Sequence, residues 1–176
     1  MKLLVVAVLS AMGMSTASAA VNGTLTITGN VTAQTCEIDA AQLTRTVDLG
    51  EITKGASMNV AVDAPIQGVG KPLTFNVTKC PASTTSVGVK FDFTADTAKP
   101  QFMKNTGTGA GVLLGITDSS DDLVASGGTV NATDLDAKAG TATVNAKVQA
   151  YRIAVNDAGI TAGDIASTAT VTVAMK

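Results

Sequence analysis

The sequence predicts an all-β fold, an immunoglobulin-like β-sandwich, and three features of its patterning lead to that prediction. Apolar and polar residues alternate in many short stretches, and a period of two is typical of half-buried strands. Gly, Asp, Asn or Pro residues separate these stretches, as turn residues do between strands. No stretch of useful length has the period of 3.6 residues that indicates a helix. Short strands joined by turns in this way are typical of two packed antiparallel sheets.

The chain begins with the features of a bacterial secretory signal peptide. Lys2 precedes an apolar run over residues 3–14, and Ala17-Ser18-Ala19 forms a small-x-small cleavage pattern. The run is too short to cross a membrane, and no later stretch approaches 18 apolar residues. We therefore expect the mature protein to begin at Ala20, with Val21 as second choice, and not to insert stably into a membrane.

The first strand of the mature chain is expected at 23–31, with Val21 ahead of it. Its even positions are Asn or Thr, so an extended chain has one polar face and one face of apolar residues and glycine. That second face consists of Val21, Gly23, Leu25, Ile27, Gly29 and Val31. Because the stretch starts almost at the end of the mature chain, it could fold back onto its own domain or complete another molecule.

The remaining strands are expected in chain order, each from its own alternation. They are centred on Val47 and Leu49, on Met58, Val60 and Val62, on Leu73, Phe75 and Val77, on 87–93, on 112–116, on weaker pieces near 123–124 and 130, on 144–155 and on 169–175. Within 144–155, Val144 and the apolar residues up to Ala150 share one parity, whereas Tyr151, Ile153 and Val155 share the other. We therefore expect a β-bulge near Ala150 or Tyr151, where the side chains would change face.

The composition argues against several classes of function. The chain has 12 Lys and Arg against 14 Asp and Glu, and it lacks a basic cluster for nucleic acid or anionic membrane surfaces. It contains no histidine, the commonest general base and metal ligand. The acidic residues Asp118, Asp121 and Asp122 could form a calcium loop, but their spacing fits no EF-hand and favours a solvated Asp-Ser turn. We therefore expect no enzymatic activity, no metal and no cofactor.

The two cysteines, Cys36 and Cys80, allow a single intramolecular pairing. Export to an oxidising compartment permits that disulfide, and two unrelated free thiols are the alternative. On the chain-entropy model, closing a loop of this size would stabilise the fold by roughly 4 kcal/mol.

Several motifs together resemble the subunits of chaperone–usher fimbriae and are similar to the type 1 fimbrial major pilins. They are Gly-x-Leu-x-Ile-x-Gly-x-Val at 23–31, Cys36-Glu37-Ile38-Asp39, Val47-Asp48-Leu49-Gly50, and Phe75-Asn76-Val77-Thr78-Lys79-Cys80-Pro81. Gly163 stands fourteenth from the C-terminus, as a glycine does in that family. Met175 departs from the family, which usually has an aromatic residue, commonly Tyr, at the penultimate position.

The resemblance implies an immunoglobulin-like domain that is incomplete and is completed by a donor strand from another subunit. Residues 1–19 would then be the signal peptide, 20–35 the N-terminal donor-strand extension and 36–176 the pilin domain. The six positions on the apolar face of 21–31 would be the donor residues. Burial of four apolar donor side chains would supply roughly 6–12 kcal/mol per joint before entropy is subtracted. The acceptor groove would be lined by Val144, Val148, Tyr151, Ile153, Val171, Val173 and Met175.

The resemblance also implies partners and a location. The partners would be identical or related pilin subunits, a periplasmic chaperone and an outer-membrane usher, and the final location would be a fimbria on the cell surface that supports adhesion. Within the family, the alternative is a minor or tip-adaptor subunit. Outside it, the alternatives are a self-contained secreted β-sandwich binding module, in which residues 21–31 form the domain's own first strand, and a small secreted enzyme.

Overall fold

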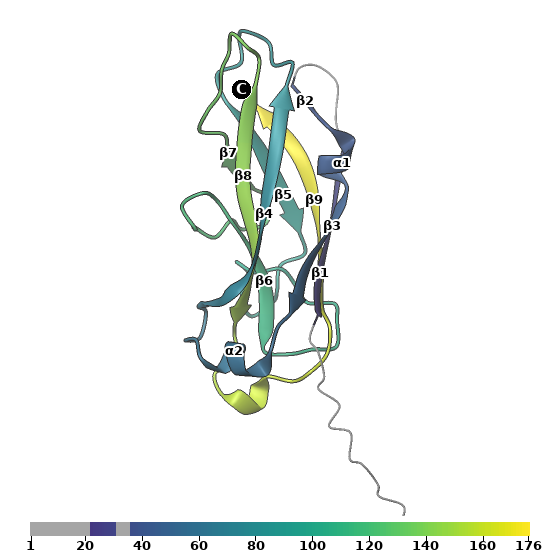
Figure 1. The fold of residues 1–176 in the computed structure, drawn as a ribbon, viewed down its shortest axis with the longest axis vertical. Coiled ribbons are helices and arrows are strands. Elements are labelled where there is room, and N and C mark those ends of the chain that lie inside the picture. Colours follow the sequence, from purple (N-terminus) through teal and green to yellow (C-terminus); the bar gives the residue numbers. More distant parts are fainter. Residues whose placement is uncertain (1–21, 31–35) are drawn as a thin grey trace, which may run out of the picture.

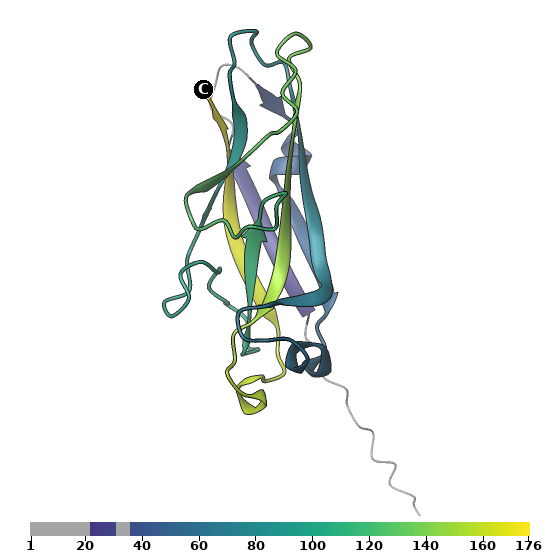
Figure 2. The same cartoon turned by 90° about the vertical axis from the view of Figure 1, so that its left-hand side faces the viewer.

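The computed structural model describes residues 22–30 and 36–176, which form a sandwich of two β-sheets along the axis of an elongated molecule (Figures 1 and 2). The predicted signal peptide lies outside the described residues. In chain order the elements are β1 (Asn22–Asn30), β2 (Glu37–Ile38), α1 (Ala40–Leu43), β3 (Arg45–Glu51), α2 (Lys54–Met58), β4 (Pro65–Thr78), β5 (Val87–Phe93), β6 (Val112–Thr117), β7 (Gly128–Asn131), β8 (Ala142–Arg152), the 3-10 helix η1 (Asp157–Gly159) and β9 (Ile165–Met175).

The prediction of an all-β sandwich is confirmed. Sheet A has five strands in the order β3-β1-β9-β5-β7, and sheet B has four in the order β2-β4-β8-β6. Among the described strands, β1 and β9 are the one pair of neighbours that run parallel; the others are antiparallel. Sheet A therefore mixes both kinds of pairing at its centre.

The core lies between the sheets, and the alternation of β4 and β5 places side chains in it. Leu73, Phe75 and Val77 of β4 are buried, as are Val89 and Phe91 of β5. The rings of Phe75 and Phe91 meet edge to face across the two sheets, with centroids 6.0 Å apart. Removing such a side chain from water contributes about 1.5–3 kcal/mol, so this alternation holds the layers together.

The strand expected around Met58, Val60 and Val62 is wrong, because the chain forms the short helix α2 and a turn there. The hydroxyl of Thr53 caps α2 by accepting a hydrogen bond from the N–H of Ala56 at 3.1 Å. Met58 and Val62 are each 38% exposed, so their alternation does not correspond to burial. No helix in the described part of the chain is long and apolar enough to cross a membrane.

The β-bulge expected near Ala150 or Tyr151 lies at that point of the β4–β8 ladder, but in the partner strand and not in β8. β8 pairs with β6 without interruption over residues 147–152. The irregularity lies in the partner on the other side, β4, whose register against β8 shifts between Pro65 and Gly70. The extra residues therefore belong to β4. They precede the alternating residues Leu73, Phe75 and Val77 of that strand.

The acidic loop after β6 is a turn. The carboxylate of Asp118 accepts hydrogen bonds from the N–H of Ser120 at 2.8 Å and of Asp122 at 3.1 Å. An Asp side chain that binds backbone groups two and four residues ahead fixes such a turn. The structure thus agrees with the interpretation of this segment as an Asp-Ser turn.

Candidate functional site

The candidate site is the gap between β3 and β9 in sheet A, called the strand groove from here on, and β1 occupies it. β1 pairs antiparallel with β3, with residues 24–27 opposite 48–45. On its other side it pairs parallel with β9, with residues 23–30 opposite 165–172. Since β3 and β9 are neighbours of β1 and not of each other, this one strand makes sheet A continuous.

β1 contributes to the core as well as to the sheet. The side chain of Leu25 is 0% exposed and belongs to the same cluster as Val47 of β3 and Ile165 of β9. The apolar face expected for this strand is thus turned inward at Leu25. Of the other expected donor residues, Gly23, Ile27 and Gly29 lie within β1 by backbone position, and Val21 and Val31 lie outside the described residues.

The residues expected to line the groove fall into two groups. Val144 and Val148 of β8 and Val171 of β9 are 0% exposed and face the core. Val173 is partly buried against the same core, and Met175 is 36% exposed near the end of the chain. These five residues lie on the inner surface of the sandwich or at its rim, where an inserted strand could contact them.

Tyr151 and Ile153 require a correction, because they lie on the opposite face of sheet B. Tyr151 is buried in a separate cluster with Phe102 and Leu113, and Ile153 packs against that cluster. The rings of Tyr151 and Phe102 have centroids 4.9 Å apart. The opposite parity of these residues therefore marks a second apolar cluster outside the core and not the strand groove.

A small cavity of about 60 Å³ lies next to the start of β1, at the end of the molecule where α2 is labelled in Figure 1. Its apolar lining includes Ile52, Val112, Ile160 and Ile165. In the register of β1, Gly23 is the residue opposite Ile165. The apolar alternation does not reveal this cavity, because Ile52 and Ile160 stand outside the alternating stretches.

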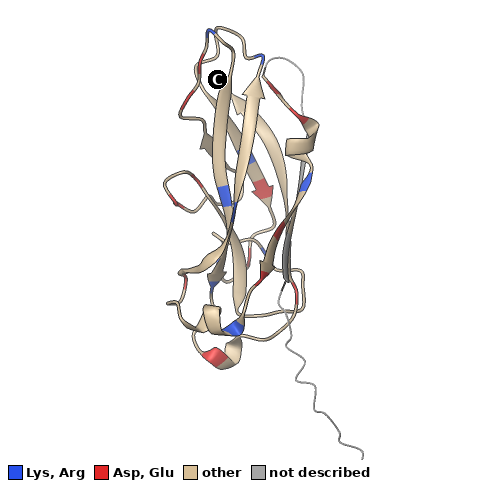
Figure 3. Cartoon of the chain, viewed as in Figure 1, with Lys and Arg blue, Asp and Glu red and all other residues tan. Residues whose placement is uncertain are grey.

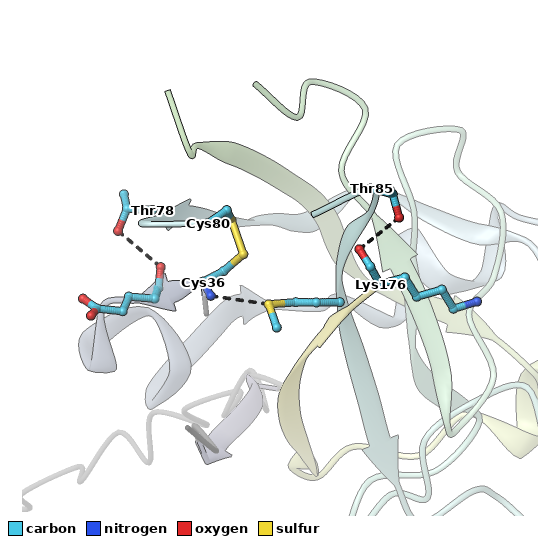
Figure 4. Close-up of a disulfide and its surroundings, with 7 residues drawn as sticks. Cys36, Thr78, Cys80, Thr85 and Lys176 are labelled. Atoms are coloured by element: carbon cyan, nitrogen blue, oxygen red, sulfur yellow. Dashed lines mark hydrogen bonds between the residues drawn. A yellow bond between two sulfur atoms is a disulfide. The ribbon is translucent and has the colours of Figure 1, made fainter. Parts of the chain in front are cut away.

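The C-terminal end of β9 lies beside the disulfide (Figure 4). The N–H of Cys36 donates a hydrogen bond to Sδ of Met175 at 3.4 Å. The N–H and hydroxyl of Thr85 donate to the backbone oxygen of Lys176 at 2.7 and 3.0 Å. The disulfide between Cys36 and Cys80 is confirmed, and Cys36 directly precedes β2.

Arg45 marks the rim of the strand groove, and sequence reasoning did not single it out. It is the β3 residue opposite Ile27 of β1, and its guanidinium lies 4.6 Å from the centroid of the Phe75 ring. The guanidinium also donates to the carbonyl of Thr74 at 3.4 Å. Burial lowers the pKa of Arg45 from its ordinary value. The side chain thus covers one end of the core with its stem and its planar group.

Charged side chains do not form a patch of one sign in the view of Figure 3, where they are scattered singly along the strands and at both ends. Some are paired at the surface, as Lys79 and Glu37 are at 2.7 Å. Such exposed pairs contribute about 0–1 kcal/mol. The strands beside the strand groove thus offer backbone hydrogen bonds and apolar side chains.

Comparisons with known proteins agree with one another. The model of a family described as "Fimbrial protein" matches residues 25–176. The chain is 31% identical over 159 residues to an uncharacterized fimbrial-like protein, YbgD, of Escherichia coli strain K12, with 85% of this chain and 82% of that protein covered. It is 33% identical over 142 residues to fimbrial protein 987P of Escherichia coli, with 77% and 64% covered. The solved P pilus rod subunit PapA shares the fold, with a TM-score of 0.63 at 14% identity over 81% of this chain and 100% of that one.

Proposed function

Because the chain belongs to the fimbrial protein family and is a structural subunit of a surface pilus, we propose that it polymerises by exchanging β1 between subunits. In this proposal β1 of one subunit leaves its own strand groove and fills that of the next. The observation that carries the proposal is the position of β1, a terminal strand lying between two strands that do not pair with each other. Strand addition of this kind draws affinity from backbone hydrogen bonds and specificity from side-chain pockets.

The orientation of β1 favours exchange. β3 and β9 run in opposite directions, so a strand between them must be parallel to one and antiparallel to the other. β1 is parallel to β9, its longer partner, over residues 23–30, and antiparallel to β3 over the shorter match. Parallel pairing is slightly less stable per residue. A strand from another subunit that ran in the reverse direction would be antiparallel to β9. The longer of the two pairings would then be of the more stable kind.

We propose that the exchange begins at the cavity beside Ile52 and Ile165. It lies next to the start of β1 and has an apolar lining. An apolar side chain of an incoming strand could enter it before β1 leaves. The incoming strand would then gain buried area at each step as it replaced β1, at about 25 cal/mol per Å².

A subunit whose groove is empty would need protection. The edges of β3 and β9 would present unpaired backbone groups beside apolar side chains, which favours aggregation. We therefore propose that a periplasmic chaperone lends a strand to the groove and that an outer-membrane usher receives the subunit from it. Residues 20–35 would be the donated extension and residues 36–176 the domain that receives a donor.

Deletion of residues 20–28 tests the exchange. The truncated subunit should form no fibres alone by electron microscopy, and it should bind a synthetic peptide of residues 20–35 with a rise in its Tm. A peptide that carries Leu25→Asp is the matched control and should not bind, because an unpaired carboxylate in an apolar site costs several kcal/mol. If the truncated chain does not fold alone, the two peptides are added during refolding.

Two results would contradict strand exchange. One is a truncated subunit that makes fibres as long as those of the full mature chain. The other is equal rescue of folding by the two peptides, since the inward residue Leu25 would then contribute nothing to recognition.

A further inference from the structure

A second site lies on the outer face of sheet B, away from the strand groove. A hollow of about 440 Å³ opens there between β8, the start of β4 and the loop after β6, and it is called the outer hollow from here on. Its polar lining consists of Gln67, Asp121, Asp122, Lys147, Gln149 and Tyr151. Small-molecule sites typically occupy roughly 300–1,000 Å³, so the outer hollow has room for a small ligand.

Gln149 is the feature that points to a ligand. Its side chain lines the outer hollow and is 7% exposed, and among the described residues it has no hydrogen-bond partner. The buried polar side-chain atoms without a partner in the described part of the chain belong to Arg45 and Thr117, so the amide of Gln149 reaches the surface of the outer hollow, where a ligand can contact it. One amide offers two N–H donors and an acceptor oxygen. Gln149 can therefore hold a ligand that both accepts and donates hydrogen bonds.

Tyr151 provides a second polar group on a rigid support. Its ring packs against Phe102, and Gly115 of β6 lets the ring lie against the sheet. A Cβ at residue 115 would come within 2.9 Å of Cε2 of Tyr151. Burial, and then the negative charge of Asp121, raise the pKa of Tyr151, which keeps the hydroxyl protonated. A rigid aromatic ring with an O–H group can contact both an apolar face and a hydroxyl of a ligand.

The charges of the outer hollow disfavour an anionic ligand. Lys147 and Asp121 pair at 3.1 Å, so the single cation of the lining is already neutralised. Asp122 is exposed and remains as one carboxylate that can accept hydrogen bonds. The site thus combines a carboxylate, amides and a phenol, with no free positive charge for an anion.

From these contacts we propose that the outer hollow binds a neutral saccharide of one or two sugar rings. Sugar hydroxyls donate to Asp122 and to the oxygen of Gln149, and they accept from the amide of Gln149 and the hydroxyl of Tyr151. The strand groove lies in sheet A, so a subunit can bind the sugar while it is joined to its neighbours. This binding is additional to strand exchange and does not depend on it.

The test uses the mature chain, residues 20–176, on an array of immobilised sugars. The array holds neutral mannosides, galactosides, glucosides and N-acetylglucosaminides beside sialylated and sulfated sugars, and calorimetry then measures the Kd of the best neutral sugar. Tyr151→Phe removes only the hydroxyl and Gln149→Met removes only the amide. Each should weaken binding about fivefold to tenfold, as the loss of one hydrogen bond does.

Asn145→Ala is the matched control, because Asn145 lies on the same strand two residues before Lys147, is exposed and does not line the outer hollow. Its Kd should equal that of the unchanged protein. Asp122 is exposed, so Asp122→Asn should leave the fold intact. It therefore tests binding even if Tyr151→Phe and Gln149→Met unfold the protein. It should also bind about fivefold more weakly.

Three results would overturn the proposal: binding to no neutral sugar, binding only to sialylated or sulfated sugars, or an unchanged Kd for Tyr151→Phe, Gln149→Met and Asp122→Asn alike. Electron microscopy of the same variants separates this proposal from strand exchange. Fibres of normal length from variants that no longer bind sugar are expected. A failure of the residue 20–28 deletion to stop fibre growth would contradict strand exchange and leave sugar binding intact.

Discussion

Replacing Leu25 with alanine tests whether β1 is part of the folded subunit. The side chain of Leu25 is 0% exposed in the core between β3 and β9. Truncating a buried leucine costs about 2–5 kcal/mol, because transferred area is lost and a cavity remains. For a domain of this size, about 1 kcal/mol moves the Tm by roughly 2–4 °C. We therefore expect Leu25→Ala to lower the Tm of the monomer by roughly 4–20 °C.

Circular dichroism during heating measures this change on the mature, disulfide-bonded monomer. Thr26→Ala is the control, since Thr26 is the next residue of β1 and is only half-buried. Its Tm should stay within about 3 °C of the unchanged protein, as is usual for substitutions outside the core. A Leu25→Ala variant that melts at the same temperature as the Thr26→Ala variant would show that β1 does not contribute to the core of the monomer.

Three further predictions concern the disulfide, the groove and acid sensitivity. Cys36→Ser should lower the free energy of unfolding by roughly 4 kcal/mol, read from urea denaturation, and an unchanged midpoint would contradict a structural role for the bond. Val173→Asp should prevent capture of the residue 20–35 peptide, because a carboxylate would face the groove; normal capture in a pull-down would place the groove elsewhere. Hydrogen bonds from the N–H and hydroxyl of Thr143 lower the pKa of Asp134, so its stabilising effect is present above about pH 4 and is lost as the pH falls through the folded pKa. Asp134→Asn should therefore lose less stability than the unchanged protein on acidification from about pH 6 to about pH 3, and urea midpoints that fall equally would contradict this.

The alternation of apolar residues was enough to predict the layers but not every element. In β4, Leu73, Phe75 and Val77 alternate over a length that a strand can use, and they are buried as expected. Met58 and Val62 show the same period over only a few residues, and the cap at Thr53 turns that segment into a helix. Short alternations carry too little information to outweigh local capping.

The candidate sites were harder to predict because they depend on which other segments of the chain pack against each face of a strand. Periodicity identified the inward face of β1 at Leu25, but it specifies a buried face without specifying whose domain buries it. The family resemblance places Tyr151 in the groove, whereas the topology packs it against Phe102 on the outer face. The outer hollow joins residues from β4, β8 and the loop after β6, and no local motif contains them together.

The direction of the strand beside β9 in assembled pili shows whether subunits exchange β1. Cryo-electron microscopy of fibres made by the mature chain would trace that strand and its connection to a domain. Strand exchange predicts that the strand between β3 and β9 comes from the neighbouring subunit and runs antiparallel to β9. A strand that remains parallel to β9 and continues into Cys36 of the same subunit would contradict it.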